Sequence, residues 1–145
     1  MAIDKSGVLW RGEDFEDLAD LIRDFRAGGY AVDRVIEAVC LGCNGRSFNV
    51  LVDDDEGCGQ RVCVACKEPS YIADSADYWE DMDPSECVCP CGGEEFAVAV
   101  GFAFCDDGEV RWVSIGLRCL RDGTLGVYAD WKIDYSPTAH LLEMA

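Results

Sequence analysis

The stretch CNGRSFNV at residues 43–50 returns 48 positions later as CGGEEFAV at residues 91–98, with Cys, Gly, Phe and Val at matching places. A second match, SYIAD at 70–74 with GVYAD at 126–130, has an offset of 56. The eight extra residues fall within a predicted hairpin, where a repeat tolerates an insertion. The sequence therefore predicts one small unit built twice, with a longer hairpin in the second copy.

Two pairs of cysteines frame the first copy, CLGC at 40–43 and CVAC at 63–66. Two tight turns that each present two sulfurs form a zinc site when a β-hairpin brings them together, and this spacing is typical of such a site. Gly45, just past the first pair, is expected to supply a positive φ in the turn. The expected ligands of the first zinc ion are Cys40, Cys43, Cys63 and Cys66.

Residues 38–74, with these cysteine pairs and the strands between them, resemble the zinc-ribbon family. The resemblance implies a structural zinc ion. It leaves the task of the protein open, because zinc ribbons serve many unrelated functions. A unit of this size buries too little apolar surface to fold well alone, so a structural metal is expected to contribute on the order of 10 kcal/mol to its folding.

The second copy matches the first imperfectly. Alignment of the copies places Asp122 opposite Cys66, and Val88, which lies between two cysteines, opposite Cys40. A carboxylate ligates zinc at a distance similar to that of a thiolate. A second zinc site is therefore possible, and the alternative is a copy that has lost its metal. The candidate ligands are Cys89, Cys91, Cys119 and Asp122, with Cys87 as a substitute for Cys89.

The N-terminal region has the pattern of an amphipathic helix over residues 14–27, with Asp14 as its N-cap and Gly28–Gly29 as its end. The long strands expected in the second copy are apolar on both faces, so they need cover on both sides, from this helix and from the other ribbon. Residues 34–40 fit either a helix or a strand, and we favour a strand there. The other strands are expected at 47–52, 60–62, 70–74, 96–104, 110–118 and 126–131.

The predicted fold class is α+β and mostly β: an N-terminal helix and two zinc-ribbon-like antiparallel units packed as one body. The expected divisions are a helical region at 1–37, a first ribbon at 38–80, and a second ribbon-like unit with a C-terminal tail at 81–145. No leader-like segment follows Met1, and the longest apolar run, 96–105, is too short to span a bilayer as a helix. We therefore expect a soluble, cytoplasmic protein with no membrane partner.

The formal net charge is −17, from 29 acidic and 12 basic residues. This charge disfavours a direct nucleic-acid partner and favours either a solvated surface or a basic protein partner. The acidic segment 74–86 interleaves carboxylates with aromatic side chains, which can act as desolvated anchors. The candidate partner-binding residues are Asp74, Asp77, Tyr78, Trp79, Glu80 and Asp81, with Asp83 and Glu86 beside them.

The sequence favours a nonenzymatic protein. Its one histidine, His140, belongs to no evident nucleophile and base set, and four cysteines around an ion leave no open coordination position. We expect an acidic, zinc-binding interaction module, for instance an inhibitor or immunity-type protein that engages a basic partner. The alternatives are a transcription-associated zinc ribbon that docks on RNA polymerase or another large complex, and a thiol redox enzyme. Neither the partner nor the oligomeric state follows from the sequence.

Overall fold

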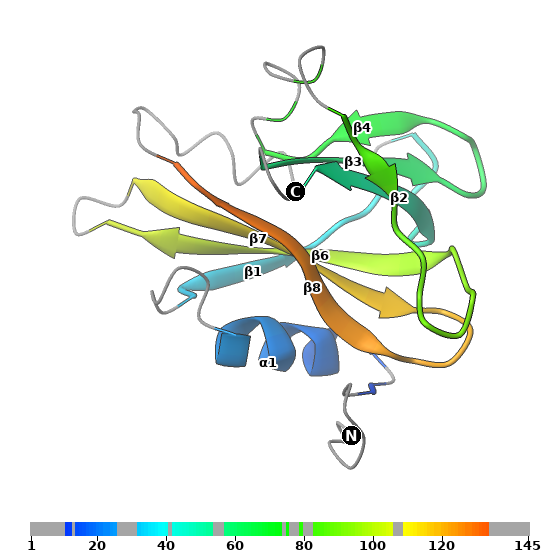
Figure 1. Cartoon of the computed structure of the whole chain (residues 1–145), viewed down its shortest axis with the longest axis horizontal. Coiled ribbons are helices and arrows are strands. Elements are labelled where there is room, and N and C mark those ends of the chain that lie inside the picture. The colour runs from blue at the N-terminus through cyan, green and yellow to red at the C-terminus, as the bar shows by residue number, and fades with distance from the viewer. Residues whose placement is uncertain are drawn as a thin grey trace.

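The computed structural model describes residues 11–12, 14–25, 32–40, 42–53, 57–73, 75, 79, 83–105 and 109–133. One helix, α1 (Phe15–Phe25), precedes the strands β1 (Arg34–Glu37), β2 (Phe48–Asp53), β3 (Cys58–Cys63), β4 (Pro69–Tyr71), β5 (Ser85–Glu86), β6 (Phe96–Phe104), β7 (Val110–Cys119) and β8 (Leu125–Lys132). The predicted α+β, mostly β class is confirmed, and the elements pack as one body (Figure 1).

The strands form one antiparallel sheet in the order β4-β3-β2-β6-β7-β8, while β1 also pairs with β6 and β5 also pairs with β2. The first copy contributes β2, β3 and β4, and the second contributes β6, β7 and β8. The order is therefore a palindrome around the junction of β2 with β6, where Phe48 is the register partner of Phe96. These two residues occupy equivalent positions in the repeat.

The sheet folds at this junction, so that the ribbon β2–β4 covers one face of β6–β8 and α1 covers the other (Figure 1). Large side chains alternate with small ones along β6 and β7. The large ones meet the ribbon in the main core, at Phe96, Val98, Val100, Phe102, Val113, Ile115 and Leu117. Both faces of the long strands are thus covered, one by α1 and the other by the first ribbon, as predicted.

Small residues form the face beneath α1. Gly101 and Gly116 lie so close to Ile22 that a Cβ on either would be 2.5 Å from an Ile22 side-chain atom. Leu18 and Ile22 are fully buried there, in one cluster with the small side chain of Ala99 from β6. The apolar stripe of α1 therefore docks closely because the sheet presents almost no side chain at these points.

The backbone N–H of Asp17 donates to Asp14 Oδ1 at 3.0 Å, which confirms Asp14 as the N-cap of α1. Residues 26–31, where the end of the helix was predicted, lie outside the described residues. The strand predicted at 34–40 is shorter, and the one at 70–74 is β4, which ends at Tyr71. The segment 74–86 ends in a strand that the sequence did not indicate: Ser85 and Glu86 form β5 on the edge of β2.

Candidate metal centres

Four cysteine sulfurs meet at the end of the β2–β3 hairpin. The set is Cys40, Cys43, Cys63 and Cys66, named centre 1 here, and its sulfur atoms all lie within 4.8 Å of one another. The Sγ atoms of Cys40 and Cys66 are 3.5 Å apart, as are those of Cys43 and Cys63. Tetrahedral zinc with Zn–S distances near 2.3 Å places its sulfurs about 3.8 Å apart. The spacing in centre 1 therefore fits a tetrahedral ion.

The second copy brings together Cys89, Cys91, Cys119 and Asp122, named centre 2, and their ligand atoms also lie within 4.8 Å of one another. Cys89 Sγ is 3.6 Å from Asp122 Oδ1, and the sulfurs of Cys91 and Cys119 are 3.6 Å apart. These two contacts correspond to the two in centre 1. Burial alternates in the same way along both sets, because each turn contributes one buried ligand followed by a more exposed one. The structure thus contains two clusters that can hold metal, consistent with zinc-ribbon-like units.

The turns that carry the ligands repeat bond by bond. In the first copy, Lys67 N donates to Cys63 O at 2.9 Å and Val64 N donates to Ser47 O at 2.9 Å. In the second, Gly123 N donates to Cys119 O at 2.9 Å and Leu120 N donates to Glu95 O at 3.0 Å. Every one of these residues matches its counterpart by an offset of 48 or 56. The ligand-bearing turns of the two copies therefore share these backbone hydrogen bonds.

The positive φ predicted at Gly45 belongs to its neighbour. Asn44 has φ 62, and its counterpart Gly92 has φ 91. Gly45 is needed for a different reason, because a Cβ there would lie 3.0 Å from Cys63 Sγ and 3.2 Å from Cys43 Sγ. Gly93 is equally close to Cys119 Sγ, at 3.0 Å. A glycine at this place in each copy gives the sulfurs the room that they occupy.

Centre 2 uses a shorter first turn. Cys89 N donates to Gly93 O at 2.8 Å, as Cys40 N donates to Gly45 O, so Cys89 takes the place that the alignment gave to Val88. Cys87 is not in the cluster. Its N–H donates to Val50 O at 2.8 Å, which continues the pairing of β5 with β2, and its side chain is buried. Burial raises the pKa of the Cys87 thiol to about 12, and Glu86 adds to this shift.

Backbone N–H groups point at the ligand atoms. The N–H of Cys66, and to a smaller degree that of Ala65, lowers the pKa of the Cys63 thiol to about 7, because hydrogen bonds stabilise the thiolate. At the position of the fourth ligand, Asp122 Oδ1 accepts a hydrogen bond of 3.0 Å from Thr124 N, which lowers the pKa of the carboxyl group. Cys66 accepts an equivalent bond from the N–H of Glu68. The carboxylate therefore occupies the environment that the repeat built for a sulfur.

Two residues near the centres were not among the predicted site residues. Arg61 is 5% exposed, and its guanidinium lies 4.8 Å from the centroid of the Phe48 ring. Burial lowers its pKa, while the charges of Cys40 and Cys63 oppose that change. In centre 2, burial and then the charges of the nearby thiolates raise the pKa of Tyr128 to about 12. The sequence does contain a signal that points to Arg61. Side chains two residues apart on a strand lie on the same face, and Arg61 stands two residues before the ligand Cys63.

The candidate partner-binding residues are only partly visible. Trp79 is described, and its ring lies 5.3 Å from that of Tyr71 in an edge arrangement. Asp83 and Glu86 are exposed. Asp74, Asp77, Tyr78, Glu80 and Asp81 lie outside the described residues, as does His140. The two remaining cysteines stand apart from both centres: Cys58 is buried in β3, and Cys105 follows β6.

All ten cysteines lie among the described residues, and none forms a disulfide. The fold and the two clusters define a protein of two ribbon-like units with cysteine-rich sites that can bind metal. No known protein family matches the chain, and no curated protein and no solved structure matches it either. Within the described residues, no helix is both long enough and apolar enough to cross a membrane.

Proposed function

We propose that this chain is a nonenzymatic zinc protein, in which two zinc ions hold a doubled ribbon scaffold that binds another protein through its acidic surface. The observation that carries the proposal is the pair of equivalent ligand sets. Each set gathers its atoms within 4.8 Å and takes them from two turns at the end of a hairpin. One such cluster is a common structural zinc site, and a second at the repeated positions supports the same use twice.

The ligand types favour zinc. Four thiolates in a tetrahedral arrangement suit zinc or an iron–sulfur site, whereas magnesium and calcium prefer oxygen ligands. Zinc also accepts a carboxylate among its ligands, at a distance close to that for nitrogen. Zinc therefore suits both the four thiolates of centre 1 and the mixed ligand set of centre 2, which includes the Asp122 carboxylate.

A structural role for both ions follows from the full ligand sets. A catalytic zinc site keeps one coordination position open, and each centre here supplies four protein ligands. A hollow of about 430 Å³ adjoins centre 2. The described residues around it are Asn49, Gly92, Gly93, Glu94, Glu95, Leu120 and Arg121, which include no nucleophile paired with a base.

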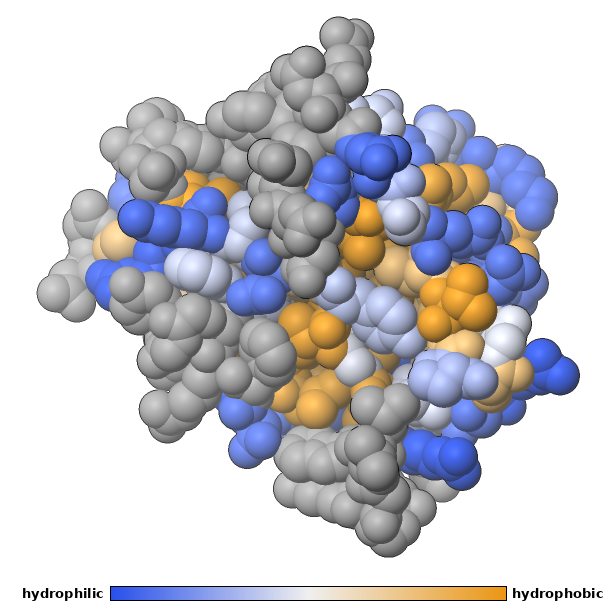
Figure 2. Space-filling model, in the orientation of Figure 1, coloured by the Kyte–Doolittle hydropathy of each residue, from blue (hydrophilic) through white to orange (hydrophobic). Residues whose placement is uncertain are grey.

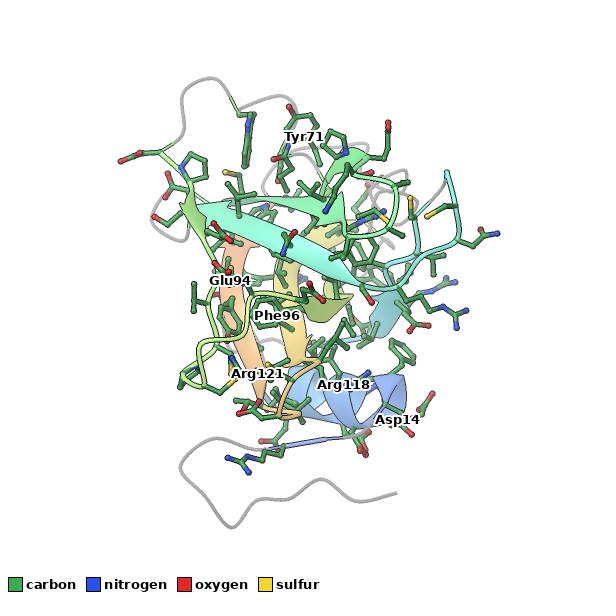
Figure 3. The ribbon with its side chains drawn as sticks, turned by 90° about the vertical axis from the view of Figure 1, so that its right-hand side faces the viewer. Asp14, Tyr71, Glu94, Phe96, Arg118 and Arg121 are labelled. Carbon is green, nitrogen blue, oxygen red and sulfur yellow. The ribbon has the colours of Figure 1, made fainter. Side chains whose placement is uncertain are left out.

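The proposed partner is a basic protein surface. The net charge of −17 supports this, because complementary charge speeds association and adds specificity. The Tyr71–Trp79 pair supplies aromatic surface, with Tyr71 36% exposed. Asp83 N donates to Asp53 Oδ2 at 3.1 Å, which ties the end of the acidic segment to the first hairpin. Figure 3 shows Tyr71 at the ribbon end of the molecule, far from Asp14 at the helix.

A second acidic feature supports the same partner. Glu86 and Glu94 are both exposed, and Glu94 raises the pKa of Glu86 through a hydrogen bond and through charge repulsion. Two carboxylates that repel each other gain most when a cation lies between them. Figure 2 shows hydrophilic residues over much of the described surface of one face, with smaller hydrophobic areas between them.

Native mass spectrometry of the protein from its own cells tests the metal proposal. We expect two zinc ions per chain, and one ion in each of the variants Cys43→Ser and Cys91→Ser. Protein that carries no metal when purified without chelators contradicts the proposal. Protein that carries iron instead of zinc contradicts the assignment of zinc as the bound metal.

The partner is tested on the complex recovered in the same preparation. We expect its affinity to fall as ionic strength rises and to be weakened by Tyr71→Ala combined with Asp83→Asn. The matched control is Asp20→Asn, which removes an exposed carboxylate from α1. An affinity independent of salt, or equal losses in variant and control, contradicts a basic partner at this surface.

A further inference from the structure

Metal binding leaves each centre with a charge that has to be balanced. A divalent ion with four anionic ligands carries a net charge of roughly −2. In centre 1, two of the ligands are almost fully buried, with Cys40 1% and Cys63 0% exposed. A buried charge is costly unless an opposite charge lies close to it. A cation therefore stabilises the negative charge of centre 1 most when it lies on the side of the centre that faces the core.

Arg61 is placed on that side. It lies in β3 two residues before Cys63, so both side chains are on the same face of the strand. Its guanidinium lies over the ring of Phe48, which is the register partner of Cys63. Arginine stays protonated at physiological pH. A permanent positive charge is thus buried against the inner side of centre 1.

The second copy has no cation at the equivalent position. Arg61 pairs with Val50 in the first copy, and the matching pair in the second copy is Leu117 with Val98. Leu117 is fully buried. The polar group near the inner side of centre 2 is the phenol of Tyr128, which is neutral and packs edge to face against Phe96 at 5.6 Å. Arg121, beside centre 2 and labelled in Figure 3, is exposed to solvent, where water screens its charge.

We propose that Arg61 is the resident counter-charge of centre 1, which makes centre 1 the slowly exchanging zinc site and leaves centre 2 as the site that exchanges its ion first. This inference rests on the proposed zinc function. It assigns different roles to two centres with the same fold: an inert ion near the β2–β3 hairpin, and a replaceable ion near the β6–β7 hairpin. The difference between the centres arises from one equivalent position, which is Arg61 in the first copy and Leu117 in the second.

The ligand sets agree with this order. Centre 1 has four thiolates, the soft ligands that select zinc, whereas centre 2 has the Asp122 carboxylate in place of one thiolate. A nearby positive charge also makes a metal-bound thiolate less basic, and the intrinsic nucleophilicity of a thiolate falls with its basicity, so the centre 1 sulfurs react more slowly with electrophiles. Both effects favour release of zinc from centre 2.

The test measures transfer of zinc from the purified two-zinc protein to a coloured chelator, and compares Arg61→Met with Arg61→Lys. Met removes the charge and keeps an apolar chain of similar length, whereas Lys keeps the charge and loses the planar group. Partners in the second shell of a metal typically contribute a factor of 10–100 to affinity. We expect Arg61→Met to speed the slow phase by about 10- to 100-fold and Arg61→Lys to restore most of the wild-type rate.

Centre 2 serves as the internal control, because its fast phase is expected to stay unchanged in both variants. Cobalt substitution of centre 1 in the Cys91→Ser background adds a readout that packing alone does not move. Loss of the nearby positive charge shifts the sulfur-to-cobalt charge-transfer band to lower energy in Arg61→Met and leaves it in place in Arg61→Lys. An unchanged slow phase in a folded Arg61→Met that still binds two zinc ions overturns the inference and leaves the zinc function standing.

A second measurement applies if Arg61→Met does not fold. Cys91→Ser retains centre 1 alone, and Cys43→Ser retains centre 2 alone. We expect zinc to leave Cys91→Ser more slowly than it leaves Cys43→Ser, and the opposite order overturns the inference. Wild-type protein that binds no zinc overturns the proposed function itself, so the two failures are distinguishable.

Discussion

Phe48 and Phe96, which stand at equivalent positions in the two copies of the repeat, are register partners where β2 meets β6. Each is also paired with the third ligand of its own centre, Phe48 with Cys63 and Phe96 with Cys119. The two rings are fully buried in one core. The repeat is therefore joined through its own equivalent residues, so the two candidate metal centres are both anchored to the same junction.

Removal of metal is expected to destabilise the whole fold. A structural zinc ion contributes on the order of 10 kcal/mol, which is comparable to the whole stability of a domain. We expect chelation to lower the unfolding temperature by more than 10 °C, since each kcal/mol corresponds to about 4 °C in a domain of this size. Circular dichroism measures the change, and added zinc should reverse it. An unchanged transition after verified loss of metal is the contrary result.

Reciprocal exchange of the fourth ligand should convert each centre into the type of the other. Asp122→Cys gives centre 2 four thiolates, and Cys66→Asp gives centre 1 three thiolates and a carboxylate. With cobalt bound, thiolate charge-transfer absorption of centre 2 should rise by about one third, as the count goes from three to four. Centre 1 should lose about one quarter by the same reasoning. Absorption that does not change in Asp122→Cys would exclude position 122 from the centre.

The choice between Cys87 and Cys89 gives a further prediction. Cys89→Ala is expected to remove the ion from centre 2, because Cys89 Sγ lies 3.6 Å from Asp122 Oδ1. Cys87→Ala is expected to leave two ions bound, since Cys87 is held against Val50 by its backbone. The number of zinc ions per chain, read by native mass spectrometry, checks both. Loss of an ion in Cys87→Ala but not in Cys89→Ala would reverse the assignment.

The helix should be displaced by a single methyl group on the sheet. In Gly116→Ala the new Cβ would lie 2.5 Å from Ile22 Cδ1, and overpacking of this kind costs about 1–3 kcal/mol. Shortening the neighbour in Gly116→Ala/Ile22→Val should recover part of that loss in a double-mutant cycle. Gly42→Ala is the control, because the nearest atom to its Cβ is 3.8 Å away. Chemical denaturation provides the free energies, and equal effects at the two glycines would contradict the close packing of α1.

One turn residue should gain from substitution by its counterpart. Lys67 has φ 66, a left-handed conformation that costs a residue with a Cβ about 1–2 kcal/mol, and the second copy has Gly123 with φ 81 at this place. Lys67→Gly is expected to stabilise the protein by about 0.5–1 kcal/mol after the entropy of the unfolded chain is included. The converse change, Gly123→Ala, should destabilise it, as its Cβ would also lie 2.7 Å from Gly12 O. Thermal unfolding of the zinc-loaded variants measures both, and a loss of stability in Lys67→Gly would refute the strain at this turn.

The sequence by itself determined what depends on local spacing. The cysteine pairs at 40–43 and 63–66, the offset of the repeat and the apolar runs of the strands all concern residues near one another in the chain. These signals were enough for the α+β class, the two hairpins and the cap at Asp14. They also gave both ligand clusters that the structure brings together, including the carboxylate of Asp122 in the second.

Only the tertiary structure decided between neighbours that local spacing leaves equivalent. Cys89 enters centre 2 rather than Cys87 because β5 pairs with β2 and holds Cys87 on that strand, a contact between segments more than 30 residues apart. Arg61 reaches centre 1 because the strand pairing sets it beside Phe48 and Cys63. Ligand spacing is set by the geometry of one turn, whereas burial and the charge around a metal are sums over segments that meet only when the sheet folds on itself.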